Sequence, residues 1–336
     1  MKINQTAGDF ESFEEDLYRV NEGSFDEIAL NLFQFQAKNN PLYSQYINLL
    51  KVDPRSVDRI ENIPFLPVSF FKSHAIKTGN WNAEAIFTSS GTTGAITSSH
   101  HVRSIRFYLE HAARCFSHFY GDPASYEIYA LLPSYMERGG SSLIAMIDNF
   151  IGRNKMGKGG FYHNRQTEML QSIRNSSQGK KLVWGVSYAL LDLADAGEAA
   201  LSGCIVMETG GMKGRRKEIT RNEMHEYLTY RLHTGSIHSE YGMTELMSQA
   251  YSKGGGVFFA PPSMKILLRD LEDPRDVSPI RGRGGINIID LANIHSCAFI
   301  ETQDLGKTGQ NGSFEVLGRI DNSDIRGCNL LVEQAP

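Results

Sequence analysis

The chain is poor in cysteine and has no long apolar run. Its 336 residues include only 4 cysteines, which are widely spaced and form no Cys-x-x-Cys pair, so a disulfide-rich scaffold is not expected. No stretch of about 18 apolar residues occurs, which argues against a membrane span. Residues 1–17 are acidic and lack the apolar segment of a secretory signal. We therefore expect a cytoplasmic protein.

A strong charge of one sign is also absent. The chain has 34 Lys and Arg against 38 Asp and Glu, a net charge of −4 and a pI near 6.2. Without a long basic run, a dedicated nucleic-acid binder is not expected. The hydrophobic share of 41% and the charged share of 21% are those of a globular chain that can bury a core.

Two familiar catalytic motifs are missing. The hydroxyl-rich segment 88–94 contains no Gly-Lys-Ser/Thr, so it is not a Walker A loop, and without Gly-x-Ser-x-Gly the chain has no nucleophile elbow of a serine hydrolase. The glycines at 282–285 precede a strand candidate rather than a helix, so they are no dinucleotide fingerprint.

Short apolar runs alternate with helical periodicities through the first two thirds of the chain. This alternation predicts an α/β sheet flanked by helices. Residues 220–231 open with Thr-Arg-Asn-Glu, the sequence of a helix capping box. Strand candidates are 85–87, 127–132, 181–184 and 204–208, and helix candidates are 104–119, 141–151 and 220–231.

The last third is β-rich. Its strand candidates are separated by Gly, Pro, Asp and Asn and lie at 257–260, 264–268, 285–290, 297–301 and 313–318. No linker-like composition separates it from the rest. We expect one catalytic unit over 1–336, with an α/β part to about 250, a β-rich part over about 251–318 and a short hinge-like tail over 319–336.

A hydroxyl-rich glycine loop follows the strand candidate 85–87. Backbone N–H groups and hydroxyls in such a loop can converge on a polyphosphate, although the same composition also suits a flexible surface turn. The loop consists of Thr88, Ser89, Ser90, Gly91, Thr92, Thr93 and Gly94.

Two further segments offer groups for a nucleotide. In the segment Tyr241-Gly242-Met243-Thr244-Glu245, the Thr244 hydroxyl and Glu245 carboxylate can serve a phosphate oxygen and a Mg²⁺ ion side by side. Tyr241 offers a flat face for a base; a helix start at Thr244 is the alternative. Gly210 and Gly211 follow a strand candidate and permit close approach to a planar ligand, or form an ordinary turn.

The last elements lie in the β-rich part and the tail. Asp304 can bind ribose hydroxyls and Arg319 a phosphate, whereas Asp304-Leu305-Gly306 also suits a tight turn. Cys328 lies two residues after Arg326, and a nearby cation favours the nucleophilic thiolate. The alternative is a small residue in a terminal segment.

The order and spacing of these elements resemble the adenylate-forming (ANL) superfamily of acyl-CoA synthetases, adenylation domains and luciferases. The resemblance implies that residues 88–94 and Thr244 contact ATP phosphates, Gly210, Gly211, Tyr241 and Gly242 surround adenine, Asp304 binds ribose, Arg319 precedes the hinge, and Glu245 ligates Mg²⁺. The lysine that usually follows the last glycine of the loop is absent, because Ala95-Ile96-Thr97 stand there.

Within that superfamily, the chain is most similar to the acyl-protein synthetase (LuxE) family. The residues that carry the similarity are 131–135, Arg138, 141–143, 210–215, 241–245 and 318–328. By position, Cys328 matches the family's acyl-accepting cysteine. Only 17 of the 336 residues follow Arg319. We therefore expect the fold of the large N-terminal core of an adenylate-forming enzyme, without the usual lid domain. Lys213 or Arg326, or a partner, then takes the place of the lid lysine.

The resemblance implies ATP-dependent activation of a carboxylic acid, most simply a fatty acid, and acyl transfer to a thiol. The thiol is Cys328, coenzyme A or a group on an acyl-acceptor or carrier protein such as a reductase. An acyl- or aryl-CoA ligase is the second hypothesis, and a non-catalytic nucleotide- or acyl-binding scaffold is the third. We expect Tyr135 and the segments near Ser141 and Ser187 to line the acyl pocket.

Some histidines and cysteines remain. His111, Cys115 and His118 share a helical face and can bind a metal, but their apolar context favours packing. His100-His101 follows the hydroxyl-rich loop and suits either a phosphate contact or a helix start. Cys115, Cys204 and Cys297 lie in apolar patterns and are expected to be inert core residues.

Overall fold

The computed structural model describes residues 5–89, 97–133, 139–155, 157–177, 179–197, 200–210, 219–278 and 282–320, without the side chains of 5–7 and 9. The chain forms two compact units. The first, discontinuous unit comprises Met1–Phe70 and Pro262–Pro336, and the second comprises Phe71–Pro261. Because the chain leaves the first unit and returns to it, the N-terminal helices pack with the C-terminal strands.

The continuous unit is built on a mostly parallel sheet with strand order β10-β9-β8-β7-β6-β4-β5. Strands β8, β7, β6, β4 and β5 pair in parallel, and β9 and β10 add antiparallel neighbours. A separate hairpin joins β2 and β3. The strands are β2 (Ala85–Thr88), β3 (Ser99–Val102), β4 (Tyr126–Leu131), β5 (Gly159–Phe161), β6 (Lys180–Val186), β7 (Cys204–Thr209), β8 (Ile237–Tyr241), β9 (Ala250–Ser252) and β10 (Val257–Phe259).

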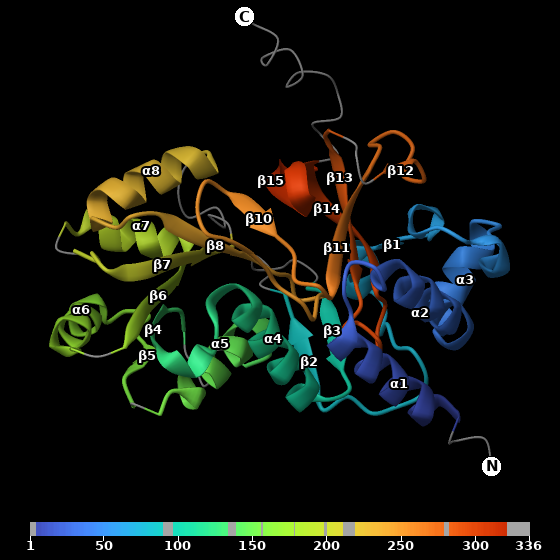
Figure 1. The fold of residues 1–336 in the computed structure, drawn as a ribbon, viewed down its shortest axis with the longest axis horizontal. Coiled ribbons are helices and arrows are strands. Elements are labelled where there is room, and N and C mark those ends of the chain that lie inside the picture. Colours follow the sequence, from blue (N-terminus) through green and yellow to red (C-terminus); the bar gives the residue numbers. More distant parts are fainter. Residues whose placement is uncertain are drawn as a thin grey trace, which may run out of the picture. The chain divides into compact units, whose positions relative to one another are not determined.

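Helices connect the parallel strands, as a parallel sheet requires. Helix α4 packs on α5 and α7 packs on α8, and Figure 1 shows these pairs on opposite faces of the sheet. Strand β4 is buried at every residue, as expected for a strand covered on both faces. The helices are α4 (Ile105–Tyr120), α5 (Ser142–Arg153), α6 (Gln166–Asn175), α7 (Ser187–Asp195) and α8 (Arg221–Leu232), with a 3-10 turn at Pro123–Ser125.

The discontinuous unit has an antiparallel sheet of order β12-β11-β13-β14-β15, and β1 pairs in parallel with β14. Three helices, coloured blue in Figure 1, belong to the same unit. Its elements are α1 (Gln5–Arg19), α2 (Phe25–Asn39), α3 (Pro41–Leu49), β1 (Leu66–Pro67), β11 (Met264–Arg269), β12 (Val277–Ser278), β13 (Gly284–Asp290), β14 (Phe299–Thr308) and β15 (Ser313–Arg319), with 3-10 turns at Pro54–Ser56, Ile60–Asn62, Val68–Lys72 and Gln310–Gly312.

Helix α2 is fixed to the turn between β13 and β14 by one buried amide. Gln36 donates to the carbonyls of Asn293 (2.9 Å) and Ile294 (3.1 Å) and accepts from the Ala298 N–H (2.9 Å). The rings of Phe33 and Tyr43 meet Phe299 in the adjoining core. A sheet that begins late in the sequence thus completes its core with the first helices.

The structure confirms the predicted mixed α/β fold and each predicted element of the continuous unit, including the α8 capping box between Thr220 and Glu223. Thr244 starts no helix, Asp304-Leu305-Gly306 lies within β14 rather than in a tight turn, and His100-His101 lies in β3 rather than at a helix start. These three alternatives are therefore wrong. The single catalytic unit stays a prediction.

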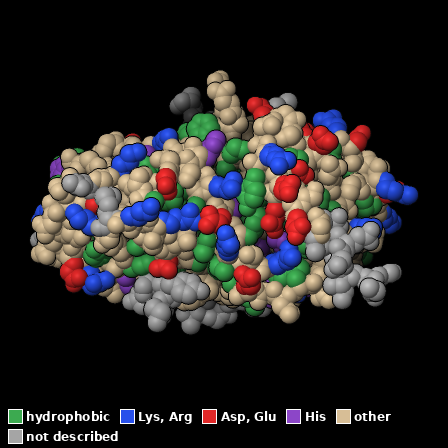
Figure 2. Space-filling view, turned by 60° about the horizontal axis from the view of Figure 1, so that its bottom comes forward, with side chains coloured by type: hydrophobic (Ala, Val, Ile, Leu, Met, Phe, Trp, Pro, Cys, Tyr) green, Lys and Arg blue, Asp and Glu red, His purple; other side chains and the backbone are tan. Residues whose placement is uncertain are grey.

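The described surface carries mixed charge. On the face shown in Figure 2, acidic and basic side chains are interspersed. Across the described ranges, no helix combines the length and hydropathy needed to cross a lipid bilayer.

Candidate functional site

The predicted nucleotide segments follow the ends of adjacent parallel strands. Strands β6, β7 and β8 end in register, with Val186 opposite Thr209 and Thr209 opposite Glu240. Ser187, Gly210 and Tyr241 therefore lie at one edge of the sheet. The carboxyl edge of an open parallel sheet is where α/β proteins bind ligands.

Ser187 and Gly210 are joined across this edge. The Ser187 hydroxyl lies 2.5 Å from the Gly210 carbonyl and 3.2 Å from Oε2 of Glu208. Both are acceptors, so the single hydroxyl proton is shared between them. Gly210 has φ of 73°, a left-handed conformation that favours glycine. The sequence places a glycine here because the chain must turn sharply as it leaves β7.

Glu208, one strand position before Thr209, is a buried carboxylate with cationic neighbours. Its Oε1 lies 3.2 Å from Nε of Arg221 and 3.6 Å from Nε2 of His225. Burial raises the pKa of Glu208, but the hydrogen bond from His225 and the charge of Arg221 outweigh burial, so the net pKa lies below its usual value. Glu208 is therefore ionised at neutral pH.

Glu240 has the opposite electrostatic environment. It directly precedes Tyr241, accepts a short hydrogen bond from Thr209 and is 7% exposed. Burial, reinforced by the charge of Glu208, raises the pKa of Glu240 to about 7 despite the Thr209 hydrogen bond. A Cβ at Gly242 would come 2.2 Å from Oε1 of Glu240, so a larger residue there would have to displace this carboxyl.

The β2–β3 hairpin carries the start of the predicted phosphate loop. The Thr88 N–H donates to the Gly140 carbonyl (2.7 Å). The Ser89 N–H donates to the Ser98 carbonyl (3.1 Å), and the Ser98 N–H donates to Oγ of Ser89 (2.9 Å). Both ends of the connection are thereby fixed. Ser90 to Gly94 lie outside the described residues.

The segment 241–245 bends away from β8 without forming a helix. Tyr241 is buried, and its ring meets Phe258 edge to face at 6.0 Å between centroids. Thr244 is partly exposed, and its carbonyl accepts a bond from the buried His100 of β3 (2.8 Å). The hairpin and the 241–245 segment, separated by more than 100 residues, are therefore directly connected.

Glu245 fits a Mg²⁺ ion that arrives with a nucleotide. It supplies a carboxylate, the oxygen ligand that Mg²⁺ prefers, and is 5% exposed. The described residues contain no group of three or more His, Cys, Asp or Glu arranged to hold a metal. One carboxylate combined with substrate phosphates is a common way of binding Mg²⁺.

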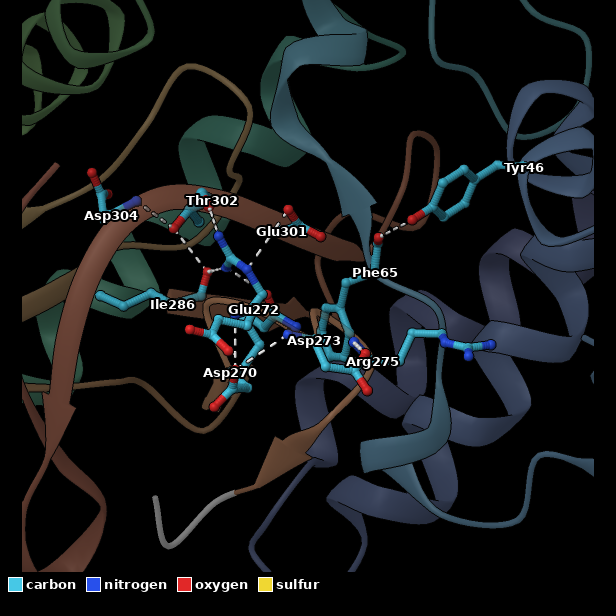
Figure 3. A network of polar contacts seen from close by, with 12 residues as sticks. Tyr46, Phe65, Asp270, Glu272, Asp273, Arg275, Ile286, Glu301, Thr302 and Asp304 are labelled. Carbon is cyan, nitrogen blue, oxygen red and sulfur yellow. Dashed lines mark hydrogen bonds and ion pairs between the residues drawn. The ribbon is translucent and has the colours of Figure 1, made fainter. Parts of the chain in front are cut away.

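Asp304 and Arg319 belong to the discontinuous unit, where they pair in register on β14 and β15. Oδ1 of Asp304 lies 3.8 Å from Nε of Arg319, whose side chain is 76% exposed. The Asp304 N–H donates to the Thr302 hydroxyl (3.1 Å). Figure 3 shows Asp304 beside Thr302 on the same strand.

A buried arginine supports that strand. Arg269 donates to the carbonyls of Ile286 (3.0 Å) and Thr302 (2.7 Å), and its Nε lies 3.6 Å from Glu301. Figure 3 labels the three partners. Burial lowers the pKa of Arg269, although the negative charges of Glu301 and Asp304 act to raise it. A Cβ at Gly285 would come 2.5 Å from the guanidinium carbon of Arg269, so that glycine makes room for the cation.

Some predicted residues lie outside the described part of the chain. They are Ser90, Gly91, Thr92, Thr93, Gly94, Tyr135, Arg138, Gly211, Lys213, Arg326 and Cys328. The sequence analysis did not identify Glu208 and Glu240 as buried carboxylates beside the predicted nucleotide segments. The available signal was a carboxylate near the end of a strand, one or two residues before a predicted site residue.

The alternative metal cluster is not formed. His111 and Cys115 are buried in contact with each other and His111 bonds to Ser248, whereas His118 is exposed. Cys115, Cys204 and Cys297 are buried. Burial raises the pKa of Cys204 and raises that of Cys297 to about 12, which disfavours the thiolate of these two residues. The predicted core placement of the three cysteines is confirmed, and their inertness stays a prediction.

Comparison with solved structures defines the class of fold. ATP-bound MatB from Rhodopseudomonas palustris matches with a TM-score of 0.54 and 17% identity, over 70% of this chain and 48% of that one. The long-chain-fatty-acid-CoA ligase FadD1 from Archaeoglobus fulgidus matches with a TM-score of 0.50 and 16% identity, over 70% and 51%. The chain has the fold of the large N-terminal part of adenylate-forming enzymes and spans about half the length of these proteins.

Sequence comparison shows similarity to one family among these enzymes. Residues 13–120 match the family "Acyl-protein synthetase, LuxE". The long-chain-fatty-acid–luciferin-component ligase of Photorhabdus luminescens is 38% identical over 69 residues, which are 20% of this chain and 59% of that relative. The predicted resemblance to the LuxE family is therefore confirmed over this part of the chain, which includes the hydroxyl-rich loop.

Proposed function

We propose that the chain activates a carboxylic acid with ATP as an acyl-adenylate, releases pyrophosphate, and transfers the acyl group to a thiol. The observation that carries this proposal is the His100–Thr244 bond. It connects the hairpin of the predicted phosphate loop to the segment of the predicted phosphate and Mg²⁺ ligands. The LuxE match over 13–120 and the fold of ATP-bound MatB support the same activity.

In the first step a substrate carboxylate oxygen attacks the α-phosphorus of ATP, and the bond to the bridging oxygen of pyrophosphate breaks. Residues 88–94 and the Thr244 hydroxyl stabilise the charge that develops on the phosphates. Asp304 and the glycines 210–211 orient the nucleoside for in-line attack. Mg²⁺ on Glu245 would neutralise phosphate charge.

In the second step a thiolate attacks the acyl carbonyl, and AMP leaves as the acyl–phosphate bond breaks. We propose Cys328 as the acceptor, with Arg326 lowering the thiol pKa and Lys213 or Arg326 as the cation beside the acyl group. The buried cysteines leave Cys328 as the thiol suited to this role, in a reducing cytoplasm. Coenzyme A, or a carrier or reductase protein, would receive the acyl group next.

A long-chain fatty acid is the proposed substrate. The Photorhabdus relative is named as a long-chain-fatty-acid ligase, and FadD1 is a long-chain-fatty-acid-CoA ligase. The segments beside Ser141 and Ser187 are proposed to line the acyl pocket.

Acid-dependent ATP–pyrophosphate exchange tests the first step, with a panel of fatty and aromatic acids. We expect exchange with at least one class of acid. Exchange with none would contradict activation and favour a nucleotide-binding scaffold.

Labelled acid tests the second step. The wild-type protein should acquire a hydroxylamine-labile acyl group that Cys328→Ser abolishes and the buried-cysteine control Cys204→Ser retains. If Cys328→Ser still forms acyl-CoA at the wild-type rate and the wild type never carries acyl label, the chain is an acyl-CoA ligase instead.

A further inference from the structure

The hairpin strand β3 contributes one fully buried histidine. His100 is 1% exposed, whereas the next residue, His101, is partly exposed, as the alternation of side chains along a strand requires. The ring of Phe71 meets His100 edge to face at 5.7 Å. The imidazole is therefore confined by its surroundings rather than solvated.

The tautomer of His100 follows from its partner. Nδ1 lies 2.8 Å from the Thr244 carbonyl oxygen, which only accepts hydrogen bonds, so Nδ1 carries a proton. Burial lowers the pKa of His100 to about 4, despite the Thr244 bond, which raises it. The ring is therefore neutral at pH 7, with its proton on Nδ1 and a lone pair on Nε2.

The segment that His100 contacts is the turn after β8, next to the predicted Mg²⁺ ligand. Between β8 and β9, a turn bond joins the Leu246 N–H to the Met243 carbonyl (3.1 Å). The bond from His100 reaches this turn at Thr244, whose side chain and whose neighbour Glu245 are the predicted phosphate and Mg²⁺ ligands. Small displacements of such groups cost catalysis far more than they cost stability.

We propose that His100 is a positioning residue that fixes the Thr244 backbone to the β2–β3 hairpin and thereby orients Thr244 and Glu245 toward Mg·ATP. This inference rests on the proposed function, because the ligand is that of the adenylation step. It assigns no contact with the nucleotide to His100 itself. The role requires an N–H donor at Nδ1, which the bond to the Thr244 carbonyl places on this buried histidine.

The matched variants are His100→Asn and His100→Leu. Both remove the imidazole ring, but the Asn amide can donate from nearly the position of Nδ1, whereas Leu cannot. An exposed histidine on α4, replaced in His118→Leu, serves as the control for loss of a ring elsewhere. Any difference between the two His100 variants therefore reports on the hydrogen bond.

We expect His100→Leu to lower kcat for ATP–pyrophosphate exchange about 10- to 100-fold, the effect of leaving one buried acceptor unpaired. His100→Asn should recover most of that loss. The Mg²⁺ concentration for half-maximal exchange should rise in His100→Leu and stay near that of the wild type in His100→Asn. Equal kcat values and equal Mg²⁺ dependence in the two variants would overturn the inference, while exchange by the wild type would leave the proposed function intact.

Two measurements are independent of turnover. In the nucleotide-free protein, ¹⁵N spectra of labelled histidines should show His100 protonated on Nδ1 at pH 7; protonation on Nε2 would overturn the inference. Calorimetry, at a temperature where both variants are folded, should show weaker Mg·ATP binding by His100→Leu than by His100→Asn. Absence of exchange in the wild type alone would instead count against the proposed function.

Discussion

Two carboxylates at neighbouring strand ends show how strongly local surroundings control charge. Glu208 faces Arg221 and His225, so its pKa is lowered on balance although burial opposes this. Glu240 accepts a hydrogen bond from Thr209, and burial raises its pKa to about 7. The raised pKa of Glu240 therefore reduces the negative charge beside ionised Glu208, near the place where a polyphosphate is proposed to bind.

Glu240→Gln tests this difference through pH. The pKa of Glu240 is raised on folding, so its contribution to stability is complete below the ordinary pKa of 4.5 and is lost as pH rises through about 7. Gln keeps an acceptor for Thr209 and does not titrate. We expect the unfolding free energy of Glu240→Gln, relative to wild type, to increase by about 2 kcal/mol between pH 5 and pH 8.

Urea unfolding followed by tryptophan fluorescence measures the effect, because both tryptophans of the chain, Trp81 and Trp184, lie in the continuous unit. The exposed helical residue Glu226, replaced in Glu226→Gln, is the control. A difference that stays constant with pH would show that Glu240 is ionised in the folded protein.

At the level of elements, sequence patterns predicted the buried strands and capped helices that carry the site. The apolar runs at β4, β6 and β7 and the capping box of α8 are local signals, and the structure confirms them. The pairing of the N-terminal helices with β13 and β14 has no local signal. It depends on the buried amides of Gln36 and Asn40 and on aromatic contacts between residues more than 200 positions apart.

Gln36→Leu tests how far α2 stabilises the β13–β14 turn. The substitution removes the acceptor of the Ala298 N–H and the donor to the carbonyls of Asn293 and Ile294. We expect the Ala298 amide to exchange with solvent roughly 10- to 100-fold faster, since each unpaired buried group costs about 1–3 kcal/mol.

Gln34→Leu is the matched control on the same helix, because Gln34 donates instead to the Pro54 carbonyl (2.6 Å). It should leave Ala298 exchange unchanged. Equal effects of both variants would mean that helix α2 as a whole, not the Gln36 amide, protects the turn.

At the level of the whole molecule, the proposed reaction requires one chain to bind a nucleotide and an acyl group together as an acyl-adenylate. A ligand that combines the two groups should therefore stabilise the protein more than either part.

A non-hydrolysable acyl-sulfamoyl adenosine provides this test. If it binds about 100-fold more tightly than the acyl-free adenosine sulfamate, it should add about 2.7 kcal/mol to the unfolding free energy at equal concentration. Denaturant unfolding with each compound measures the difference. Equal stabilisation by the two compounds would indicate a nucleotide-binding scaffold rather than an acid-activating enzyme.

Local sequence patterns predict the α/β class, the hydroxyl-rich loop, the Tyr-Gly-Met-Thr-Glu segment and the resemblance to adenylate-forming enzymes. Apolar periodicity, glycine placement and motif spacing are properties of neighbouring residues, so they can be recognised without coordinates. The coordinates were needed to find the His100–Thr244 bond, the opposite pKa shifts of Glu208 and Glu240, and the packing of the first helices on the last strands. Each of these depends on burial and on contacts between residues far apart in the chain, which sequence spacing does not encode.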